Sequence, residues 1–488
     1  MDFANPNRFD DRVLSTSHMT PAQSKDSSRK VAKGFFKTLF RAVAIIALIL
    51  ALIIVTVTLA YHRHLSSQIR TRLAVLKSAH RPLTLSELNT YYPQIPAESN
   101  AAVIYQQAFD LLKKTEAFNS LEKLQELPKG PEPLPLHLLQ SMEEACQENA
   151  KTLELLDEAA LLRQCRYPVD YTPGWRALLP HLPLLSKCAI LELCNGVLQE
   201  RKGDIGRAIK AIEVIMSMAE SLDTEPDLIS VMTQNKLYVQ SSDILLWLLN
   251  HRQLTREQIT ELQRLFQNSV RTNSLERALA GEPCFLLATF NSSATEILSE
   301  IDPGSEKRSG VVLSMYVLQI SGRLKKDEIR FLDRVRECDE ILSEPFPEGL
   351  RRAENIRLEL QQEARKGAIL TAMYFPAILK GIERNGERIA RQQLVQTALA
   401  IEHYRIIENR LPNSLVELTP RFLPEVPTDP FDDKEIRYRK EADGYAIYCI
   451  GPDRIDDEGK KEIPRAAKID HPRGDIVFAV SRKSEVKP

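Results

Sequence analysis

The sequence has almost no excess of charge of either sign. Its 488 residues carry 65 Lys and Arg side chains against 66 Asp and Glu side chains, which gives a formal net charge of −1. Nucleic-acid-binding domains concentrate basic side chains, so this balance argues against a nucleic-acid partner. Because single hydrophobic cores stop growing near about 250–300 residues, the length predicts two or three domains.

Paired cysteine motifs are also missing. The seven cysteines are an odd number at irregular spacings, and none forms the CxxC pair that zinc and redox sites use. We expect them to be mostly buried thiols.

Common catalytic motifs are absent as well. The sequence contains no GxSxG, HExxH, Walker-type or GxGxxG pattern, which removes the usual grounds for a hydrolase, a zinc protease or a nucleotide-binding protein. His62 and His64 are interpreted as headgroup-facing residues, and His403 as a partly buried helix residue. The acidic run that includes Glu143 and Glu144 is typical of a solvated helix face. We therefore predict no catalytic residues and no nucleotide.

One long apolar segment is present. Residues 42–61 contain no charged side chain, and about 20 such residues in a helix match the roughly 30 Å hydrocarbon core of a bilayer. The small residues near Ala60 also fit a cleavable signal peptide, but the 41-residue leader and the length of the run favour an uncleaved anchor. The lipid bilayer is thus the first predicted partner.

The basic residues on either side of the apolar run barely distinguish between its two orientations in a membrane. Basic residues are nearly as frequent after the run as before it, so the positive-inside rule barely favours a cytoplasmic N-terminus. The first 30 residues are rich in Ser, Asp, Asn and Pro and have little apolar periodicity, which predicts disorder.

Helical periodicity dominates the middle of the chain. The segment 99–114 begins with Ser99 as a predicted N-cap and then repeats apolar residues at helical spacing. Short loops between the segments favour antiparallel packing. Further helices are predicted at about 136–164, 175–201, 204–222, 227–250, 255–280, 322–343 and 347–383.

One of these helix pairs resembles a single tetratricopeptide-type hairpin. Gly196 and Ala208 are small residues that let two helices cross closely, and Gly203-Asp204 makes the turn. No second copy follows at a 34-residue period, and stacked arrays need at least three repeats. We therefore favour an ordinary helical hairpin over a peptide-binding array.

The character of the chain changes near residue 387. A helix with one apolar face precedes a Pro-punctuated loop, and two alternating segments, EIRYRK and YAIYCI, predict a hairpin across residues 442–444. The second strand ends in Gly451-Pro452 and an acidic loop.

The stretch from HYRIIENRLP through VPTDPFDDKEIRYR and GYAIYCIGPD to RGDIVF resembles the C-terminal module of the major pseudopilin of type II secretion. The resemblance covers about 90 residues. The family's module works outside the cytoplasm, which implies the same for residues 62–488. Residues 81–109 are similar to the opening of uncharacterised bacterial envelope proteins that attach such a module to a helical domain.

In the pseudopilin family the loop after the last strand binds calcium. The resemblance implies Asp453 and Asp475 as ligands, with Asp456 or Asp457 as additional ones. Clustered carboxylates suit Ca²⁺, which takes about six to eight oxygen ligands. The alternative is a solvated turn in which the Asp side chains cap backbone amides and no metal binds. The segment between Asp457 and Asp475 is longer here than in the family.

Two departures argue against a pilus subunit. Leu39 stands where a pseudopilin has a Glu five residues after its Gly-Phe cleavage point, which here is Gly34-Phe35. More than about 300 residues separate the apolar run from the module, whereas a pilin helix runs straight into its head. A genuine pilus-like subunit would be processed after Gly34.

Together these observations predict a mainly α fold in four parts. These are a disordered cytoplasmic tail (1–38), a transmembrane helix (39–61), a large extracytoplasmic domain of antiparallel helical hairpins, partly tetratricopeptide-like (62–385), and a small α+β pseudopilin-like module (386–488).

The predicted role is binding or scaffolding at the bacterial cytoplasmic membrane, with an envelope protein as partner and a link to secretion machinery. The alternative is an envelope hydrolase whose active site lies in the helical domain. A deep cavity with converging carboxylates and a His would favour the enzyme, and an extended apolar groove would favour the binding protein.

Overall fold

The computed structural model describes residues 21–121, 127, 132–268, 273–301, 307, 309–460 and 474–482. Of residues 21–36 and Asn268, only the helical backbone is described. The chain divides into two units, residues 1–64 and residues 65–488, and the second is called the body below. Of the predicted disordered tail, residues 1–20 lie outside the described residues, whereas residues 21–38 belong to helix α1 and are not the disordered segment that was predicted.

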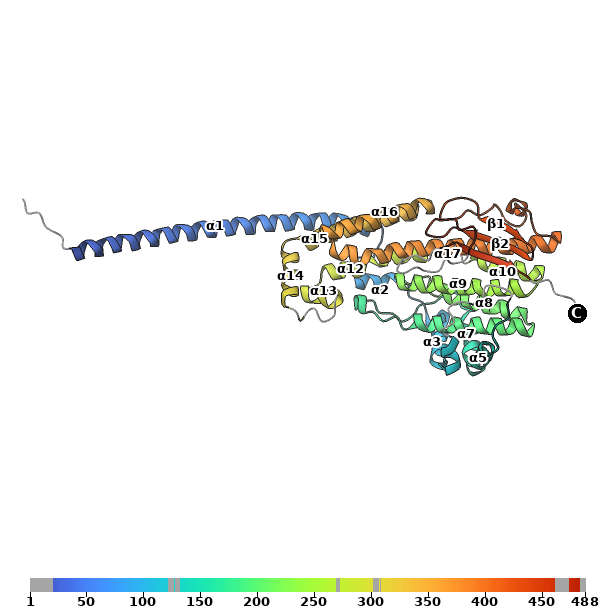
Figure 1. Cartoon of the computed structure of the whole chain (residues 1–488). Coiled ribbons are helices and arrows are strands. Elements are labelled where there is room, and N and C mark those ends of the chain that lie inside the picture. Colours follow the sequence, from blue (N-terminus) through green and yellow to red (C-terminus); the bar gives the residue numbers. More distant parts are fainter. Residues whose placement is uncertain are drawn as a thin grey trace, which may run out of the picture. The chain divides into compact units, whose positions relative to one another are not determined.

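The apolar run lies in helix α1, Pro21–Ser78 (Figure 1). Its large apolar side chains are exposed, as in Leu48 at 71% and Leu52 at 65%, so they have no protein core to pack in. This helix is long and apolar enough to cross a membrane. The segment Gly174–Lys202 passes the same test of length and composition, but half of its apolar window is buried, as expected for a core helix.

The body is mainly helical, as predicted, and a small antiparallel sheet is added near its C-terminal end. Short 3-10 turns occupy Ala97–Ser99, Gly174–Arg176 and Leu415–Leu418. The helices are α2 Leu85–Tyr91, α3 Ala101–Leu111, α4 Glu116–Leu121, α5 Leu136–Glu148, α6 Ala150–Ala159, α7 His181–Lys202, α8 Ile205–Glu220, α9 Leu228–His251, α10 Arg256–Asn268, α11 Ser274–Gly281, α12 Pro283–Phe290, α13 Ala294–Ile301, α14 Ser309–Ile320, α15 Arg323–Ser343, α16 Phe346–Arg365 and α17 Ile369–Glu408.

Helices α7, α8 and α9 form the centre of the body (Figure 1). Gly203, with φ +83°, ends α7, and the Asp204 side chain accepts the N–H of Arg207 at 2.9 Å to begin α8. A Cβ on Gly196 would lie 3.2 Å from that of Ala211, so the two helices approach closely there. The predicted hairpin is confirmed, with Ala211 rather than Ala208 opposite Gly196.

One N-cap was predicted at the wrong residue. Helix α3 is capped by Asn100, whose side chain accepts the N–H of Ala102 at 3.1 Å, and not by Ser99. The same amide donates to the Arg166 carbonyl at 2.9 Å, a contact distant in sequence. The tertiary contact therefore selects the cap.

The part of α1 that belongs to the body is bound to α15. Arg72 Nε lies 2.8 Å from Asp333 Oδ1, and Arg81 pairs with Asp339. Lys325 Nζ donates to Ser66 Oγ at 2.7 Å. These polar contacts fix the chain that follows the apolar run to a helix about 260 residues later in the sequence.

The sheet has the strand order β1-β2-β3, all antiparallel, with β1 Arg437–Glu441, β2 Gly444–Cys449 and β3 Ile476–Ser481. Tyr438 faces Ile447 across the predicted hairpin, which is confirmed. The central strand β2 is buried throughout. At the end of β3, the Ser481 N–H donates to Asn250 Oδ1 at 2.7 Å, and Arg482 pairs with Glu402 at 2.8 Å. The sheet is therefore tied to both α9 and α17.

The predicted domain boundary at 385/386 falls inside a helix. Helix α17 runs unbroken from Ile369 to Glu408 and contains Pro376 in its interior. It packs against α9, α10, α15 and α16 as well as β2 and β3. A division of the body into two domains at this residue stays a prediction.

The buried thiols are confirmed. Six of the seven cysteines are buried, and Cys146 is partly exposed. Burial raises the pKa of the Cys165 thiol to about 12, so it is protonated near neutral pH.

Candidate functional site

The acidic loop after β2 binds mainly its own backbone. Asp453 accepts the N–H groups of Ile455 and Gly474, each at 3.2 Å. Asp475 accepts those of Asp457 at 3.3 Å and Gly459 at 2.6 Å. These carboxylates therefore bring together the two ends of the segment that separates them in sequence.

An internal cation lies beside this loop. Asp456 accepts the Glu458 N–H at 2.9 Å and faces the Arg437 guanidinium at 3.7 Å. Arg437 also pairs with Asp429 at 2.6 Å and Asp432 at 2.5 Å. Asp429 is fully buried, and it also accepts the Ile450 N–H at 2.7 Å. Arg437 thus balances part of the negative charge of this region.

The residues described around the loop do not fit a calcium cage. In the described part of the chain no three His, Cys, Asp or Glu side chains gather where they could hold a metal ion. Ca²⁺ takes about six to eight oxygens. Asp457 Oδ2 is buried without a hydrogen-bond partner, but it is a single orphan oxygen. Calcium binding by Asp453, Asp456, Asp457 and Asp475 stays a prediction.

A second polar group lies deep in the body. His181 Nε2 lies 2.9 Å from Glu225 Oε1, and Asp227 Oδ2 accepts bonds from Tyr171 at 2.8 Å and Ser230 at 2.9 Å. Burial raises the pKa of Asp227 to about 6. All five residues are buried, and the bond from Tyr171 to Asp227 ties segment 166–172 to the start of α9.

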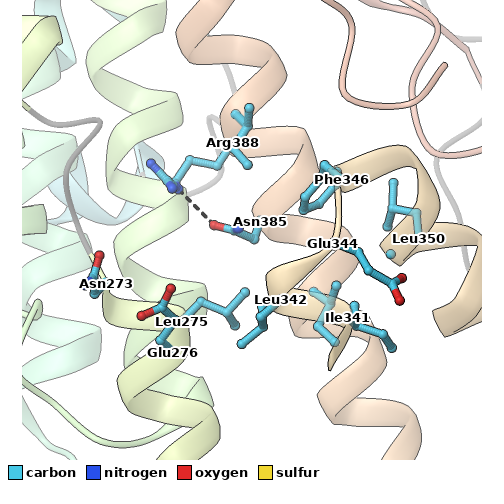
Figure 2. A pocket seen from close by; sticks show the side chains of 13 residues that line it. Asn273, Leu275, Glu276, Ile341, Leu342, Glu344, Phe346, Leu350, Asn385 and Arg388 are labelled. Atoms are coloured by element: carbon cyan, nitrogen blue, oxygen red, sulfur yellow. Dashed lines mark hydrogen bonds between the residues drawn. The ribbon is translucent and has the colours of Figure 1, made fainter. Parts of the chain in front are cut away.

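A cavity of about 180 Å³ lies where α11, α15, α16 and α17 meet (Figure 2). Arg388 and Asn385 of α17 stand at one side and Phe346 at another (Figure 2). The lining combines apolar side chains with polar and charged ones, which include the carboxylates of Glu276 and Glu344 as well as Arg388. It comprises Asn273, Leu275, Glu276, Ile341, Leu342, Glu344, Phe346, Gly349, Leu350, Ile382, Asn385, Arg388 and Ile389.

Two glycines determine the wall of this cavity. A Cβ on Gly386 would lie 2.3 Å from Phe346 Cε1, so the ring packs directly on the α17 backbone. A Cβ on Gly349 would lie 2.8 Å from the Ile341 carbonyl oxygen, so α16 turns back tightly on α15. The cavity begins where these close contacts end.

Arg388 is the most unusual group in the lining. Arg388 is 8% exposed, and its guanidinium group donates to Asn385 Oδ1 at 3.2 Å and to Gln392 Oε1 at 3.1 Å. Among the described residues, no carboxylate forms an ion pair with it. Its guanidinium also lies 6.0 Å from the centroid of the Tyr238 ring. A buried cation with only amide partners retains capacity to bind an anion.

Burial lowers the pKa of Arg388, although arginine remains charged at any physiological pH. Asp223 attracts it over a longer range, but burial raises the pKa of Asp223 to about 7, so this carboxyl group is partly protonated near neutral pH. Gln234 donates a hydrogen bond to Asp223 and stabilises the ionised form. The positive charge of Arg388 is therefore incompletely balanced.

Two more cavities adjoin these groups. A small one of about 20 Å³ lies on another side of Arg388, beside Tyr238 and Phe266. A larger one of about 280 Å³ lies between the acidic loop, at Asp453 and Arg454, and Glu383 of α17. Glu383 is already paired with Lys380 at 2.7 Å and Arg357 at 3.1 Å, so its charge is balanced within the body.

Sequence analysis missed Arg388 and Arg437. An arginine in a helix or strand is usually solvated, and the burial of Arg388 depends on tertiary packing that its local sequence does not reveal. For Arg437, the acids of the preceding DPFDD segment were an available signal. Glu143 and Glu144 are exposed on α5, as predicted.

No family model matches this chain, and neither a curated protein nor a solved structure matches it.

Proposed function

We propose that this chain is a membrane-anchored binding protein of the bacterial envelope. Residues 42–61 would cross the cytoplasmic membrane, with the body outside the cytoplasm. In this proposal the body acts as a scaffold that binds an envelope partner. The resemblance of the C-terminal module to a pseudopilin supports a link to secretion machinery.

The cavity beside Arg388 carries the binding part of the proposal. Arg388 supplies a buried cation with amide partners, and Leu275, Phe346 and Ile382 supply apolar surface. This combination suits a group with a carboxylate at one end and a branched aliphatic or aromatic portion at the other. A cavity of about 150 Å³ holds benzene in another protein, so 180 Å³ is enough for a side chain or a small acid.

The enzyme alternative would need a cavity in which carboxylates and a histidine converge. None of the three cavities described above is lined by a histidine, and the buried His181–Glu225 pair lines none of them. The proposal therefore assigns binding, with no reaction.

The binding test uses the full chain in lipid nanodiscs and three probes with the same aliphatic chain: 4-methylpentanoate, its amide and the corresponding amine. We expect the carboxylate to bind with a Kd of about 1 mM or tighter. The amide should bind more weakly because it lacks charge, and the amine should not bind. Ligand-observed NMR gives the affinities, and Arg388→Met should abolish binding of the carboxylate.

Arg336→Met is the matched control, because Arg336 is a 64% exposed arginine of α15 outside the cavity lining. It should leave binding unchanged. Equal binding of all three probes, or binding that survives Arg388→Met, would reject an anion site at Arg388.

Membrane anchoring is tested separately by alkaline extraction of membranes from cells that express the chain. The intact chain should stay in the pellet. Replacement of Leu48 and Leu52 by Asp should release it, because each charge at the centre of a span costs about 2.5–3.5 kcal/mol on insertion scales. Extraction of the intact chain into the supernatant would reject the anchor.

A further inference from the structure

Helix α14, Ser309–Ile320, exposes a continuous apolar stripe. The stripe consists of four residues at helical spacing i, i+3, i+4 and i+7, which lie on one face of the helix. Their exposed fractions are 64% for Leu313, 44% for Tyr316, 55% for Val317 and 67% for Ile320. Met315, by contrast, is buried at 7% against the body. An exposed stripe of this size needs a partner.

The body places α14 next to the chain that follows the apolar run. Helix α14 ends at Ile320, and α15 begins at Arg323 after Gly322, whose φ is +73°. In the first turn of α15, Lys325 Nζ donates to Ser66 Oγ at 2.7 Å. Both residues belong to the body, so this proximity does not depend on where residues 1–64 lie.

Covalent geometry then limits the distance from Ser66 to the apolar run. Ser66 follows Tyr61, the last residue of that run, by five positions. Even a fully extended chain spans at most about 18 Å over five residues. If residues 42–61 cross a bilayer, Tyr61 lies at the surface of its hydrocarbon core. Ser66, which contacts the first turn of α15, is then within about 18 Å of that surface.

Basic residues border the stripe. Lys307 precedes α14 and is exposed, and Arg323 and Lys326 follow it and are also exposed. An apolar face with flanking Lys and Arg is typical of helices that lie in the bilayer interface, because the cations face anionic headgroups. With 12 residues, α14 is too short to cross a membrane, for which about 20 are needed.

We infer that α14 is an interfacial helix, and that its stripe inserts into the surface of the bilayer crossed by residues 42–61. This inference rests on the membrane anchoring in the proposed function. It adds a second contact between the body and the lipid, so that the body is held against the membrane rather than only tethered to it. The partner is an anionic lipid surface.

The test labels single cysteines in the full chain, in a Cys146→Ser background because the other native cysteines are buried. An environment-sensitive nitrobenzoxadiazole dye is placed at Leu313→Cys, and at Val317→Cys as a second site on the stripe. Leu136→Cys is the control, because Leu136 is 71% exposed on α5, which packs on α7 away from α14 (Figure 1). Ile49→Cys reports on the predicted span.

The proteins are placed in phosphatidylcholine–phosphatidylglycerol nanodiscs with or without nitroxide-labelled lipid. We expect about twofold or greater quenching of the dye at 313 and 317, and none at 136. Quenching at 49 without quenching at 313 and 317 would overturn the inference and leave the anchor intact. Absence of quenching at 49 would overturn both. A dye at 313 that is shielded from the nitroxide lipid in discs with several chains, but quenched in discs with one chain, would identify a second copy as the occupant instead.

Discussion

Arg388 and Arg437 are both largely buried, but their surroundings differ. Arg437 faces the carboxylates of Asp429, Asp432 and Asp456, so its charge is fully compensated by neighbouring acids. Arg388 has two amide partners, and Asp223, which attracts it over a longer range, is partly protonated near pH 7. The first arrangement stabilises a loop, whereas the second leaves a cation available to a ligand.

Replacement of Arg437 by Leu should therefore be costly. Asp429 would remain fully buried without its counter-charge, and breaking a buried pair in this way typically costs about 3–5 kcal/mol of unfolding free energy. Arg439→Leu, two residues along the same strand, should cost no more than about 1 kcal/mol because its pair with Glu441 is exposed. Denaturant unfolding followed by circular dichroism measures both changes.

Calcium gives this experiment a second use. If Ca²⁺ bound the acidic loop, a saturating concentration would supply positive charge and restore much of the stability lost in Arg437→Leu. We expect no such recovery, because the loop carboxylates described here accept backbone N–H groups. A calcium-dependent rise in stability that disappears in Asp453→Ala would instead support the predicted metal site.

The buried carboxyl group of Glu192 should make the stability of the fold decrease as the pH rises. It is fully buried on α7, and burial raises its pKa to about 8, although a hydrogen bond from Asn195 opposes the shift. The folded pKa exceeds the unfolded value of about 4.3, so the fold favours the protonated form. Its contribution to stability is complete below that unfolded value and is lost as the pH rises through about 8.

Glu192→Gln should therefore raise the melting temperature at pH 8 and flatten its decline between pH 5 and 9, because glutamine has no charge to bury. Glu143→Gln is the control at an exposed site of α5, and it should change neither. Parallel pH profiles for Glu192→Gln and the unmodified chain would contradict the assignment of a buried, titrating carboxyl group at this position.

At the level of elements, glycines fix how helices meet. A Cβ on Gly281 would lie 2.2 Å from the Pro226 carbonyl oxygen, so the end of α11 touches the backbone of the loop before α9. Because the clash is with backbone, a side-chain rotation cannot relieve it. A Cβ on Gly310 in α14, by contrast, would meet no atom within 4 Å.

Gly281→Ala should thus destabilise the body by about 1–3 kcal/mol through overpacking. Gly310→Ala, which gains helix propensity without a clash, should be neutral or stabilising by up to about 1 kcal/mol. Thermal unfolding of the two variants provides the comparison. A stabilised Gly281→Ala variant would mean that the loop at Pro226 yields easily.

Element types were predicted well where local signals are strong. The segments predicted at 204–222 and 227–250 correspond to α8 and α9, since helical periodicity is a local property. The segment predicted at 255–280 comprises two helices, α10 and α11, which a single apolar pattern did not separate. The Arg388 cavity was not predicted, because it needs the tertiary packing of α11 against the three consecutive helices α15, α16 and α17.

At the scale of the whole molecule, α17 links the helices to the sheet. Its Ala398 carbonyl accepts a bond from Tyr445 at 3.3 Å, and its Glu402 pairs with Arg482. The Arg482 side chain also donates to the Leu249 carbonyl of α9 at 2.7 Å. The bond between Arg482 and Leu249 joins residues on the two sides of the predicted domain boundary.

A fragment that starts at residue 386 should therefore fail to fold by itself. It would lose the first half of α17 and every contact with α9, and the sheet would have one exposed face. A ¹H–¹⁵N correlation spectrum should have little dispersion, whereas fragment 65–488 should unfold in one cooperative transition. A well-dispersed spectrum for 386–488 would establish the C-terminal module as an independent domain.

The position of β3 has a consequence for biosynthesis. This strand completes the sheet and contacts Asn250 of α9, yet it follows the apolar run by almost the whole of the described chain. Translation is vectorial, so the apolar run leaves the ribosome long before β3 exists. Insertion into the bilayer would therefore precede completion of the body, and the chain would fold while already held at the membrane.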